Sequence, residues 1–493
     1  MGLAKVALVN LNRIQIPPIG PYAIDILGSA LEEAGHDVGV LDLTPAEDPI
    51  ESIDSYFKKS TPDLVGLSLR NTGDIYFPSF LDLPTKGSFL EEHHRLISRI
   101  RLHVPAEKMI LGGVGFSSNA EKLLKRFGLK YGIIGPGDAL IVGIANAINE
   151  GKSIKEFGNC DEGIFDGRKS QLARKIKRKF IDNRWYYKNG GLGNVRTSNG
   201  CGMSCSYCIE PIAKGKGFNT RDIADVIEEI DQLVAMGIND IHTADSEFNM
   251  PIIHSKEVLR AIIARGYPNK VRFWTYCQPS PFDEEYASLL AKANFVGANF
   301  GVDHADPEVL KSLGKWFGRN HIANATKMCK DNGIAVMHEL IFGYPGDTPK
   351  KMFETIEFAK SLDPWVIGVV VGFGVLNGTK LAGIFQKKVV SGESLDGFYI
   401  SGEPLTDPVF YADPSFKIPE IFDELRDYVG RDINRIMIPQ MTSKSGENNQ
   451  LVGSERVMNT LKNGKTGAYW YHYRNYNSGI EQPVPAIMLQ KNK

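Results

Sequence analysis

The sequence predicts an α/β protein with a doubly wound, Rossmann-like parallel sheet first, a partial (β/α)6 TIM barrel second and a small C-terminal domain last. Two observations support this prediction. Short apolar runs alternate with helical periodicity between residues 5 and 134, and a second alternation of the same kind covers residues 194 to 373. The pattern weakens after about residue 385. At 493 residues, the chain is long enough for two or three domains.

The first alternation places strands at residues 5–10, 38–43, 63–69, 108–112 and 131–134. A Pro/Gly loop follows the first strand, and a helix then carries Ile24, Leu27 and Leu31 on one face and ends near Gly35. Strands that are separated by helices form parallel sheets, whose ligands bind beyond the carboxyl ends of the strands. We therefore expect residues 1–150 to form the first domain and the polar, Gly-containing residues 151–193 to form a linker.

The second alternation predicts the partial barrel over residues 194–385. Its strands are expected at 194–198, 240–243, 271–276, 295–302, 335–342 and 365–373, with crossover helices between most of them. Barrel active sites lie at the C-terminal ends of the strands. Residues 386–493 are expected to close the barrel and shape a substrate pocket. Within them, 419–429 is predicted to be a helix, and the aromatic run 468–474 is predicted to be a strand or a lid over the barrel.

Composition excludes several classes of function. The net charge of −1 and the pI near 6.8 give no electrostatic case for binding nucleic acid or an acidic membrane surface. No run of 18 apolar residues exists, so no transmembrane helix is expected. The N-terminus leads directly into an apolar strand pattern rather than a signal peptide. These features predict a cytoplasmic protein with no nucleic-acid or membrane partner.

Three cysteines lie within eight residues: Cys201, Cys205 and Cys208, with the spacing C-x3-C-x2-C. Three thiolates on one short loop can hold three irons of a [4Fe-4S] cubane and leave the fourth iron open to a substrate-like group. A zinc knuckle is the alternative, but no His or Cys follows Cys208 until His242. A disulfide framework is disfavoured because six cysteines in 493 residues is sparse. The other three cysteines are interpreted as ordinary small residues.

Glycines and hydroxyl side chains gather in three loops at the predicted carboxyl edge of the first sheet. Glycines let backbone amides approach a ligand, and hydroxyls bind phosphate or amide groups. The residues expected to bind a ligand in these loops are Ser68, Arg70, Asn71, Thr72, Gly112, Gly113, Val114, Gly115, Phe116, Gly135, Gly137 and Asp138.

The cysteine spacing resembles the signature loop of the radical S-adenosylmethionine (SAM) enzymes. In this family the open iron of the cluster chelates SAM, so Cys201, Cys205 and Cys208 are the expected catalytic and metal-binding residues. The segment Glu33-Ala34-Gly35-His36-Asp37-Val38, together with the glycine turns at 112–113 and 135–138, resembles the cobalamin-binding domain of cobalamin-dependent members. The resemblance covers roughly residues 1–375 and implies a [4Fe-4S] cluster, SAM and cobalamin as cofactors.

One departure concerns the lower face of cobalt. The D-x-H-x-x-G loop of the better-known cobalamin mutases and of methionine synthase, which supplies a histidine to cobalt, is absent here. Arg70 is the hypothetical replacement. A guanidinium cannot ligate cobalt and would favour a low-coordinate metal. The alternative, in which Arg70 pairs with a carboxylate or a phosphate, remains open.

Several predicted strand ends resemble the places where radical SAM enzymes contact SAM. Residues 243–247 stand where the family has Gly-Gly-Glu, and 301–304 resemble its G-[IV]-E-S with Asp for Glu and His for Ser. Residues 333–348 resemble its adenine-binding strand and turn. The resemblance implies a SAM site made of Tyr207, Glu247, Gln278, Asp303, Glu339, Phe342 and Gly343.

The resemblance implies a methyltransferase that moves a methyl group from SAM, by way of methylcobalamin, to an unactivated carbon or phosphorus of a small molecule or peptide. Hydrogen abstraction and polar transfer to an aromatic carbon both remain open. An electron donor such as flavodoxin or ferredoxin is the implied partner. Alternatives are a non-methylating cyclisation or rearrangement with the same cofactors, or a cobalamin-binding sensory protein.

Overall fold

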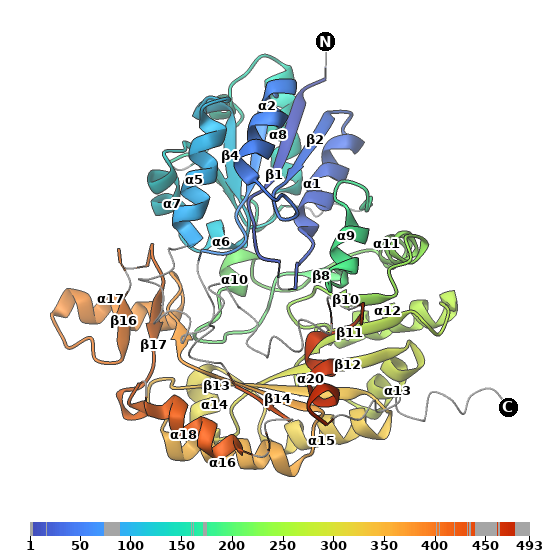
Figure 1. Cartoon of the computed structure of the whole chain (residues 1–493), viewed down its shortest axis with the longest axis vertical. Coiled ribbons are helices and arrows are strands. Elements are labelled where there is room, and N and C mark those ends of the chain that lie inside the picture. The colour runs from blue at the N-terminus through green and yellow to red at the C-terminus, as the bar shows by residue number, and fades with distance from the viewer. Residues whose placement is uncertain are drawn as a thin grey trace.

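Two parallel sheets, stacked end to end, form the body of the protein (Figure 1). The computed structural model describes residues 3–15, 17–72, 89–158, 160, 162–170, 175–400, 402–403, 405–418, 420–430, 432, 435–438, 461 and 464–478. The N-terminal sheet lies at the top of Figure 1 and the barrel sheet lies below it. The predicted order of a doubly wound sheet followed by a partial barrel is confirmed.

The first sheet has six parallel strands in the order β2-β1-β3-β4-β5-β6. α1 and α8 pack against each other over a core cluster that includes Val6, Leu8 and Ile133, while α2, α5 and α7 cover a second cluster that includes Val9 and Leu111. The strands are buried from two sides, as in other doubly wound sheets. The elements are β1 (Lys5–Asn10), α1 (Tyr22–Glu33), β2 (Asp37–Asp42), α2 (Pro49–Lys59), β3 (Leu64–Ser68), α5 (Phe89–Arg101), η1 (Ala106–Lys108), β4 (Met109–Gly112), α6 (Val114–Ser117), α7 (Ala120–Phe127), β5 (Tyr131–Ile134) and α8 (Asp138–Asn149).

The expected linker contributes to both domains. Within it, η2 (Ile154–Glu156) is followed by β6 (Ile164–Asp166), which pairs in parallel with β5 and makes a sixth strand that the sequence pattern did not reveal. Further on, Arg178 is fully buried and forms ion pairs with Asp25 of α1 at 3.3 Å and with Glu229 of the barrel at 3.2 Å. A buried charge is tolerated only when it is paired, so this segment fixes the two domains to each other.

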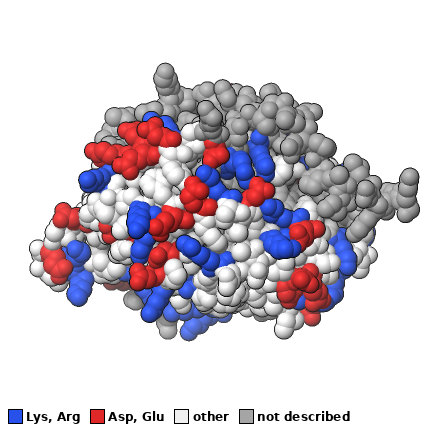
Figure 2. Space-filling view, turned by 90° about the horizontal axis from the view of Figure 1, so that it is seen from below, with Lys and Arg blue, Asp and Glu red and all other residues white. Residues whose placement is uncertain are grey.

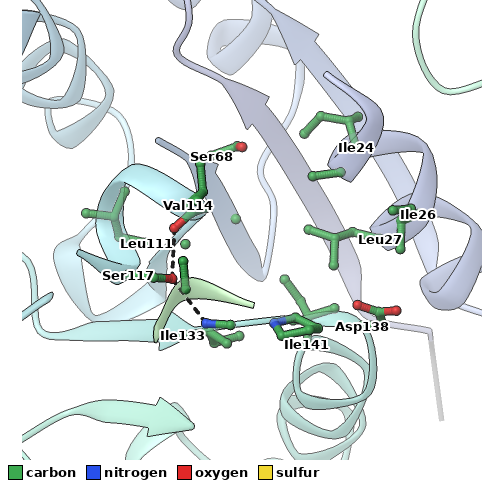
Figure 3. Close-up of a pocket in the computed structure, with 18 of the residues that line it drawn as sticks. Ile24, Ile26, Leu27, Ser68, Leu111, Val114, Ser117, Ile133, Asp138 and Ile141 are labelled. Atoms are coloured by element: carbon green, nitrogen blue, oxygen red, sulfur yellow. Dashed lines mark hydrogen bonds between the residues drawn. The ribbon is translucent and has the colours of Figure 1, made fainter. Parts of the chain in front are cut away.

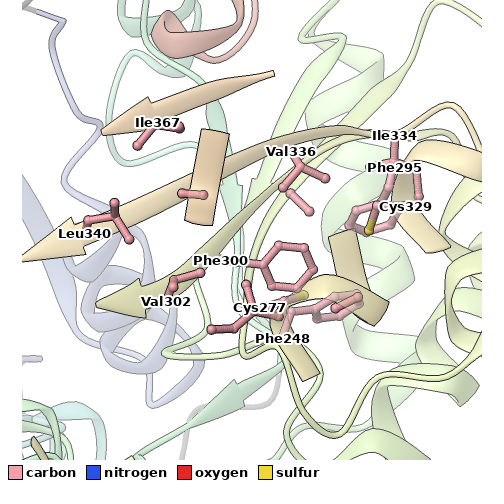
Figure 4. Packing of buried hydrophobic residues seen from close by; sticks show 14 of the residues in the cluster. Phe248, Cys277, Phe295, Phe300, Val302, Cys329, Ile334, Val336, Leu340 and Ile367 are labelled. Atoms are coloured by element: carbon pink, nitrogen blue, oxygen red, sulfur yellow. The ribbon is translucent and has the colours of Figure 1, made fainter. Parts of the chain in front are cut away.

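The barrel sheet has six parallel strands in the predicted sequence order, plus one more at its edge: β18-β14-β13-β12-β11-β10-β7. Its core cluster lies between the strands and the outer helices, and Phe295, Phe300 and Phe248 are among its largest members (Figure 4). The elements are α9 (Asn183–Lys188), β7 (Gly193–Val195), β8 (Ser198–Asn199), α10 (Glu210–Ala213), β9 (Asn219–Thr220), α11 (Ile223–Ala235), β10 (Asp240–Thr243), α12 (Ile252–Arg265), β11 (Arg272–Cys277), α13 (Glu284–Lys292), β12 (Phe295–Asp303), α14 (Pro307–Leu313), α15 (Arg319–Asp331), β13 (Ala335–Phe342), α16 (Pro349–Ser361) and β14 (Val366–Val371).

The C-terminal residues are distributed over the barrel. A three-stranded antiparallel sheet, β15-β17-β16, lies beside the barrel, and β18 extends the barrel sheet in parallel with β14. The predicted helix over 419–429 is confirmed as α18. The remaining elements are β15 (Phe373–Gly374), α17 (Lys380–Ser391), β16 (Phe398–Ile400), β17 (Val409–Tyr411), η3 (Pro414–Phe416), α18 (Glu420–Val429), β18 (Ile436–Met437) and α20 (Tyr469–Ser478).

The aromatic run at 468–474 lies mostly in helix α20, at the N-terminal end of the barrel strands. Trp470 and Tyr471 of α20 pack edge-on against Trp274, which lies near the start of β11. The same cluster holds Met337 and Val366 from the starts of two other strands. The prediction of a strand was therefore wrong; the run is helical, and its large rings cover the barrel at the end where the strands start.

The structure shows how the charges are distributed on one face and how long and apolar the helices are. In the face seen from below in Figure 2, Lys and Arg are interspersed with Asp and Glu, and neither sign forms one continuous field. Among the described residues, no helix combines the length and the hydropathy needed to cross a membrane.

Candidate functional site

The cysteine loop lies between β8 and α10, and neighbouring backbone holds it in place. The Cys201 amide donates to the Gly215 carbonyl at 3.1 Å, and the Ser206 amide donates to the Leu313 carbonyl at 2.9 Å. Gly200 has φ +88°, and a Cβ there would lie 2.6 Å from the Gly217 carbonyl oxygen. Only glycine fits this close approach, so the backbone of the loop is held against the segment that contains Gly215 and Gly217.

The donor set of the loop fits an iron–sulfur cluster. Cys201 is buried and Cys205 and Cys208 are half-buried. Burial raises the pKa of the Cys201 thiol to about 11 and that of Cys208 to about 12, so a bound metal has to displace these protons. No His, Cys, Asp or Glu trio in the described part of the chain is arranged around a single metal ion. A cubane is larger than one ion and needs its sulfur ligands farther apart.

One buried cation lies beside this loop. Lys315 is 3% exposed, and its Nζ lies 3.0 Å from Asp303 Oδ2 and donates to the Gly301 carbonyl at 3.3 Å. Asp303 Oδ2 also accepts a 2.5 Å hydrogen bond from the hydroxyl of Tyr207, which belongs to the cysteine loop. Asp303 has φ +58°, a left-handed conformation that is uncommon for residues other than glycine. Lys315 was not predicted from the sequence.

Glu247 and Gln278 meet at the same strand ends. Gln278 Nε2 donates to Glu247 Oε1 at 2.6 Å, while Glu247 Oε2 and Gln278 Oε1 are buried with no hydrogen-bond partner. A Cβ on Gly301 would lie 3.7 Å from Glu247 Oε1, 3.9 Å from Gln278 Nε2 and 4.0 Å from Lys315 Nζ. Buried polar atoms are costly when they are unpaired, and both unpartnered atoms are oxygens, so this small space is built to receive a ligand that donates hydrogen bonds.

Glu339 lies one layer deeper in the barrel. Its Oε1 accepts from Asn299 Nδ2 at 2.9 Å, and burial raises its pKa to about 7, as it does for Glu247. Asp303 and Lys315 interact electrostatically with both carboxyl groups. Three carboxyl groups therefore surround one ammonium group, an arrangement that favours a ligand carrying positive charge.

The predicted adenine-binding turn follows β13. Gly343 has φ +92°, and its amide donates to Asp347 Oδ2 at 2.8 Å. The Phe342 side chain points away from this site into the core, where it packs edge-on against His304. Phe342 can therefore contact SAM only through its backbone. Of the residues predicted for SAM, the structure brings Tyr207, Glu247, Gln278, Asp303 and Glu339 around Lys315, with Gly343 at the adjacent strand end.

A cavity of about 190 Å³ opens at the carboxyl edge of the first sheet (Figure 3). Apolar side chains form most of its wall, among them Ile24, Leu27, Ile133 and Ile141. A Cβ on Gly137 would contact Leu27 and Ile133 at 3.6 and 3.7 Å, so the glycine leaves room for a ligand. The predicted residues that line the cavity are Ser68, Gly112, Gly113, Val114, Gly135, Gly137 and Asp138.

Two residues predicted for this ligand have structural roles. Phe116 is fully buried in the core cluster of the sheet. Gly115 packs against the backbone of Arg70, whose carbonyl oxygen a Cβ would approach to 2.7 Å. The Phe116 side chain therefore cannot line the cavity. Ser117, which was not predicted, does line it: its hydroxyl donates to the Gly113 carbonyl and accepts from the Gly135 amide (Figure 3).

Arg70 is a charged residue of the predicted cobalamin loops, and one of its polar atoms has no hydrogen-bond partner. The residue is half-buried, the unpartnered atom is its buried Nη1, and desolvation lowers its pKa. The group that acts on it electrostatically is Tyr276 of the barrel, so Arg70 lies at the junction of the two domains. Among the described residues no carboxylate forms an ion pair with Arg70. Asn71 and Thr72 follow it in the same loop.

Comparisons with known proteins match both halves of the chain. Residues 195–359 match the model of the radical SAM superfamily, and residues 17–145 match that of the B12 binding domain. Tryptophan 2-C-methyltransferase of Streptomyces laurentii is 30% identical over 95% of this chain and 96% of its own length. An uncharacterized methyltransferase of Pyrococcus horikoshii is 23% identical over 70% of this chain and 74% of its own.

Solved structures agree with these matches. The radical SAM methyltransferase TsrM of Kitasatospora setae, with cobalamin and a [4Fe-4S] cluster bound, superposes with a TM-score of 0.86 at 32% identity, covering 97% of this chain and 98% of that chain. The same enzyme with tryptophan and a SAM analogue gives 0.83 at 32% identity, covering 96% and 98%. The cobalamin-dependent enzyme OxsB gives 0.68 at 15% identity, covering 94% and 71%, and shares the fold.

Proposed function

The chain belongs to the cobalamin-dependent radical SAM methyltransferases, and we propose that its substrate is tryptophan or a closely related indole, methylated at C2. The observation that supports this substrate is identity of 30% along nearly the whole length of a tryptophan 2-C-methyltransferase. The barrel strands offer suitable side chains, because the His242 ring contacts the Tyr276 ring and Asn299 donates a hydrogen bond to Glu339.

We propose that Cys201, Cys205 and Cys208 hold the cluster and that the groups around Lys315 hold SAM. Lys315 Nζ would pair with the carboxylate of the methionine part, and the unpartnered Glu247 Oε2 and Gln278 Oε1 would accept from its ammonium group. Asp303 supplies negative charge that a sulfonium attracts. The bound cofactors supply the methyl group and its carrier, and the protein binds and orients them and excludes water.

We propose that the cavity of the first domain takes the flat aromatic base that cobalamin carries on its side arm. The apolar wall would contact the ring, while Ser68, Ser117 and the glycine amides would bind the polar part of the arm. We assign residues 1–150, completed by β6 at 164–166, to cobalamin, residues 194–385 to SAM and the cluster, and residues 386–493 to the region around the barrel. The free thiols and the cluster favour a reducing cytoplasm.

Arg70 is the proposed neighbour of the lower face of cobalt. Its buried, unpartnered Nη1 supports this role over a carboxylate pair. We expect Arg70→Ala to change the visible spectrum of bound cobalamin and to lower the methylation rate, because water or a new ligand could then reach the metal. An unchanged spectrum and an unchanged rate would refute the role.

The substrate is tested by anaerobic incubation of the reconstituted enzyme with tryptophan and SAM that carries a labelled methyl group. We expect one labelled methyl group in the product, located at C2 of the indole by NMR. Methyl transfer to another aromatic compound but not to tryptophan would refute the proposed substrate and leave the family assignment intact.

A further inference from the structure

The cavity of the first domain is completed by the barrel domain. Besides residues of the first sheet and its helices, four residues from the start of the barrel line it: Arg196, Asn199, Ala213 and Lys214. Arg196 directly follows β7, and Ala213 belongs to α10, which contacts α6 at the junction of the two domains (Figure 1). A ligand in this cavity therefore meets side chains of both domains.

Hydrogen bonds from both domains hold Arg196 in place. Its amide donates to the hydroxyl of Tyr22 in α1 at 3.2 Å, and its carbonyl accepts from Arg221 Nη1 at 2.7 Å. Its own Nη1 donates to Asn199 Oδ1 at 3.1 Å, while Asn199 Nδ2 donates to the Lys214 carbonyl at 2.9 Å. The protein itself thus fixes the backbone of Arg196 and one corner of its guanidinium.

The remaining edge of this guanidinium has no partner. Nε and Nη2 of Arg196 are both buried and form no hydrogen bond, and Arg196 makes no ion pair with a carboxylate in the described part of the chain. These two atoms form one edge of the planar fork, and such an edge can bind two oxygens of a single phosphate or carboxylate group. Buried donors are costly without acceptors, so this edge favours an anion with two free oxygens.

The buried charges at the domain junction leave Arg196 without a counter-charge. Arg178 pairs with Asp25 at 3.3 Å and with Glu229 at 3.2 Å. Arg221 pairs with Glu229 at 2.7 Å. These two carboxyl groups therefore serve the other two arginines. An anionic ligand would supply the charge that Arg196 lacks.

The other charged residues among the described lining of the cavity do not bind Arg196. Lys214 pairs with Glu210 at 2.6 Å, and Asp138 of α8 forms no ion pair with Arg196. The rest of the wall is mostly apolar. One cavity therefore combines an apolar wall, which suits a flat base, with a cationic fork, which suits a phosphate.

We propose that Arg196 binds the phosphodiester in the nucleotide arm of cobalamin through Nε and Nη2. The other side arms of the corrin end in neutral amides, so the phosphodiester is the anionic group of that arm, and a sugar joins it to the base. The first domain then selects the base by its shape, and the barrel domain adds one positive charge to the same site. The inference rests on the proposed cobalamin site, and it does not depend on the identity of the methylated substrate.

The test compares three corrinoids in the full-length protein, reconstituted with its cluster and free of cobalamin. Cobinamide lacks the whole nucleotide arm, cobinamide phosphate carries the phosphate without the base, and hydroxocobalamin carries both. Titration of the visible spectrum gives the dissociation constants. We expect Arg196→Met to bind cobinamide phosphate and hydroxocobalamin about tenfold more weakly than the wild type does, and to bind cobinamide equally well.

Two further variants are controls. Arg260→Met removes an exposed arginine of α12 that does not line the cavity, and it should bind all three corrinoids as the wild type does. Gly137→Ala narrows the apolar part of the cavity, so it should weaken the binding of hydroxocobalamin and leave that of cobinamide phosphate unchanged.

The proposal is overturned if Arg196→Met binds all three corrinoids as the wild type does. It is also overturned if the variant loses affinity for cobinamide to the same extent, because a general disturbance of the site would then explain the loss. A wild-type protein that binds none of the three would overturn the cobalamin site itself, and this inference with it. Because binding is read without tryptophan and SAM, a wrong substrate assignment leaves the outcome unaffected.

Discussion

The two candidate ligand sites of this protein differ in the kind of side chain that surrounds them. The cavity of the first domain is mostly apolar, and the absence of side chains at positions such as Gly137 gives it room. The space beside the cysteine loop is instead surrounded by one buried ammonium and three carboxyl groups. The first site selects by shape and the second by charge. A change of volume should therefore disable the first, and a change of charge the second.

The largest effect is expected from the cysteine loop. Cys208→Ala removes one cluster ligand and should lower methyl transfer by about a thousandfold or more, because an incompletely held cluster is lost. Cys160→Ala, a half-buried cysteine outside the loop, is the matched control and should keep both iron and activity. Labelled methyl transfer and iron content are measured together. A Cys208→Ala enzyme with full iron content would contradict the assignment.

The second-largest effect is expected from Lys315, and it tests the role of charge in the barrel site. Lys315→Met keeps an unbranched side chain, one heavy atom shorter, and removes its cation, so affinity for SAM should fall about tenfold to a hundredfold. Equilibrium dialysis measures the dissociation constant. Lys311→Met changes an exposed lysine four residues earlier and should leave it unaltered. Wild-type SAM affinity in Lys315→Met would show that the ammonium serves the fold alone.

The role of shape in the first domain is tested by adding one methyl group. Gly137→Ala places a Cβ in ordinary contact with Leu27 and Ile133 and narrows the cavity. Cobalamin affinity should fall about tenfold, while the free energy of unfolding changes by less than about 1 kcal/mol, since the backbone there is not left-handed. Gly158→Ala, where a Cβ meets nothing within 4 Å, is the control. Equal cobalamin affinity in all three proteins would place the ligand elsewhere.

The smallest effect concerns stability and pH. Burial raises the pKa of Glu339 to about 7 from the ordinary 4.5, so the folded state holds this proton more tightly than the unfolded state does. The contribution of the group to stability is present below pH 4.5 and is lost as the pH rises through 7. We expect Glu339→Gln to raise the Tm of the cofactor-free protein by a few degrees at pH 8 and to leave it unchanged at pH 4.5.

Thermal melts across this pH range measure the effect. Glu150→Gln replaces an exposed carboxylate at the end of α8 and should change the melting temperature little at either pH. Equal gains from the two substitutions would show that net charge, and not burial of Glu339, sets the pH dependence.

Local patterns in the sequence were sufficient for the two parallel sheets and the cysteine loop. Apolar runs mark buried strands, and three cysteines within eight residues need no tertiary information to indicate a metal site. β6 escaped prediction because three residues are too few to show a period. The helix at 469–478 was missed because Trp470, Tyr471 and Tyr473 pack into one aromatic cluster, so that burial, and not helical periodicity, governs this part of its composition.

Site residues that belong to a sequence motif were predicted. Residues that reach the site only through tertiary packing were missed. Lys315 follows a short helix, and its sequence neighbours do not reveal that Gly314 packs it against the cysteine loop. Phe116 lies among loop glycines, yet the sheet buries it. Ser117 is distinguished only by the two backbone groups that converge on its hydroxyl. Tertiary contacts therefore determine the positions of Lys315, Phe116 and Ser117.

The most direct test of the account is the metal content of two anaerobically reconstituted proteins, the wild type and the variant in which Cys201, Cys205 and Cys208 are all alanine. We expect about four irons and one cobalt per wild-type chain, and no cluster but a full complement of cobalt in the variant. A variant that keeps its iron, or that loses iron and cobalamin together, would contradict the claim that one chain holds a cluster and a corrinoid at two independently built sites.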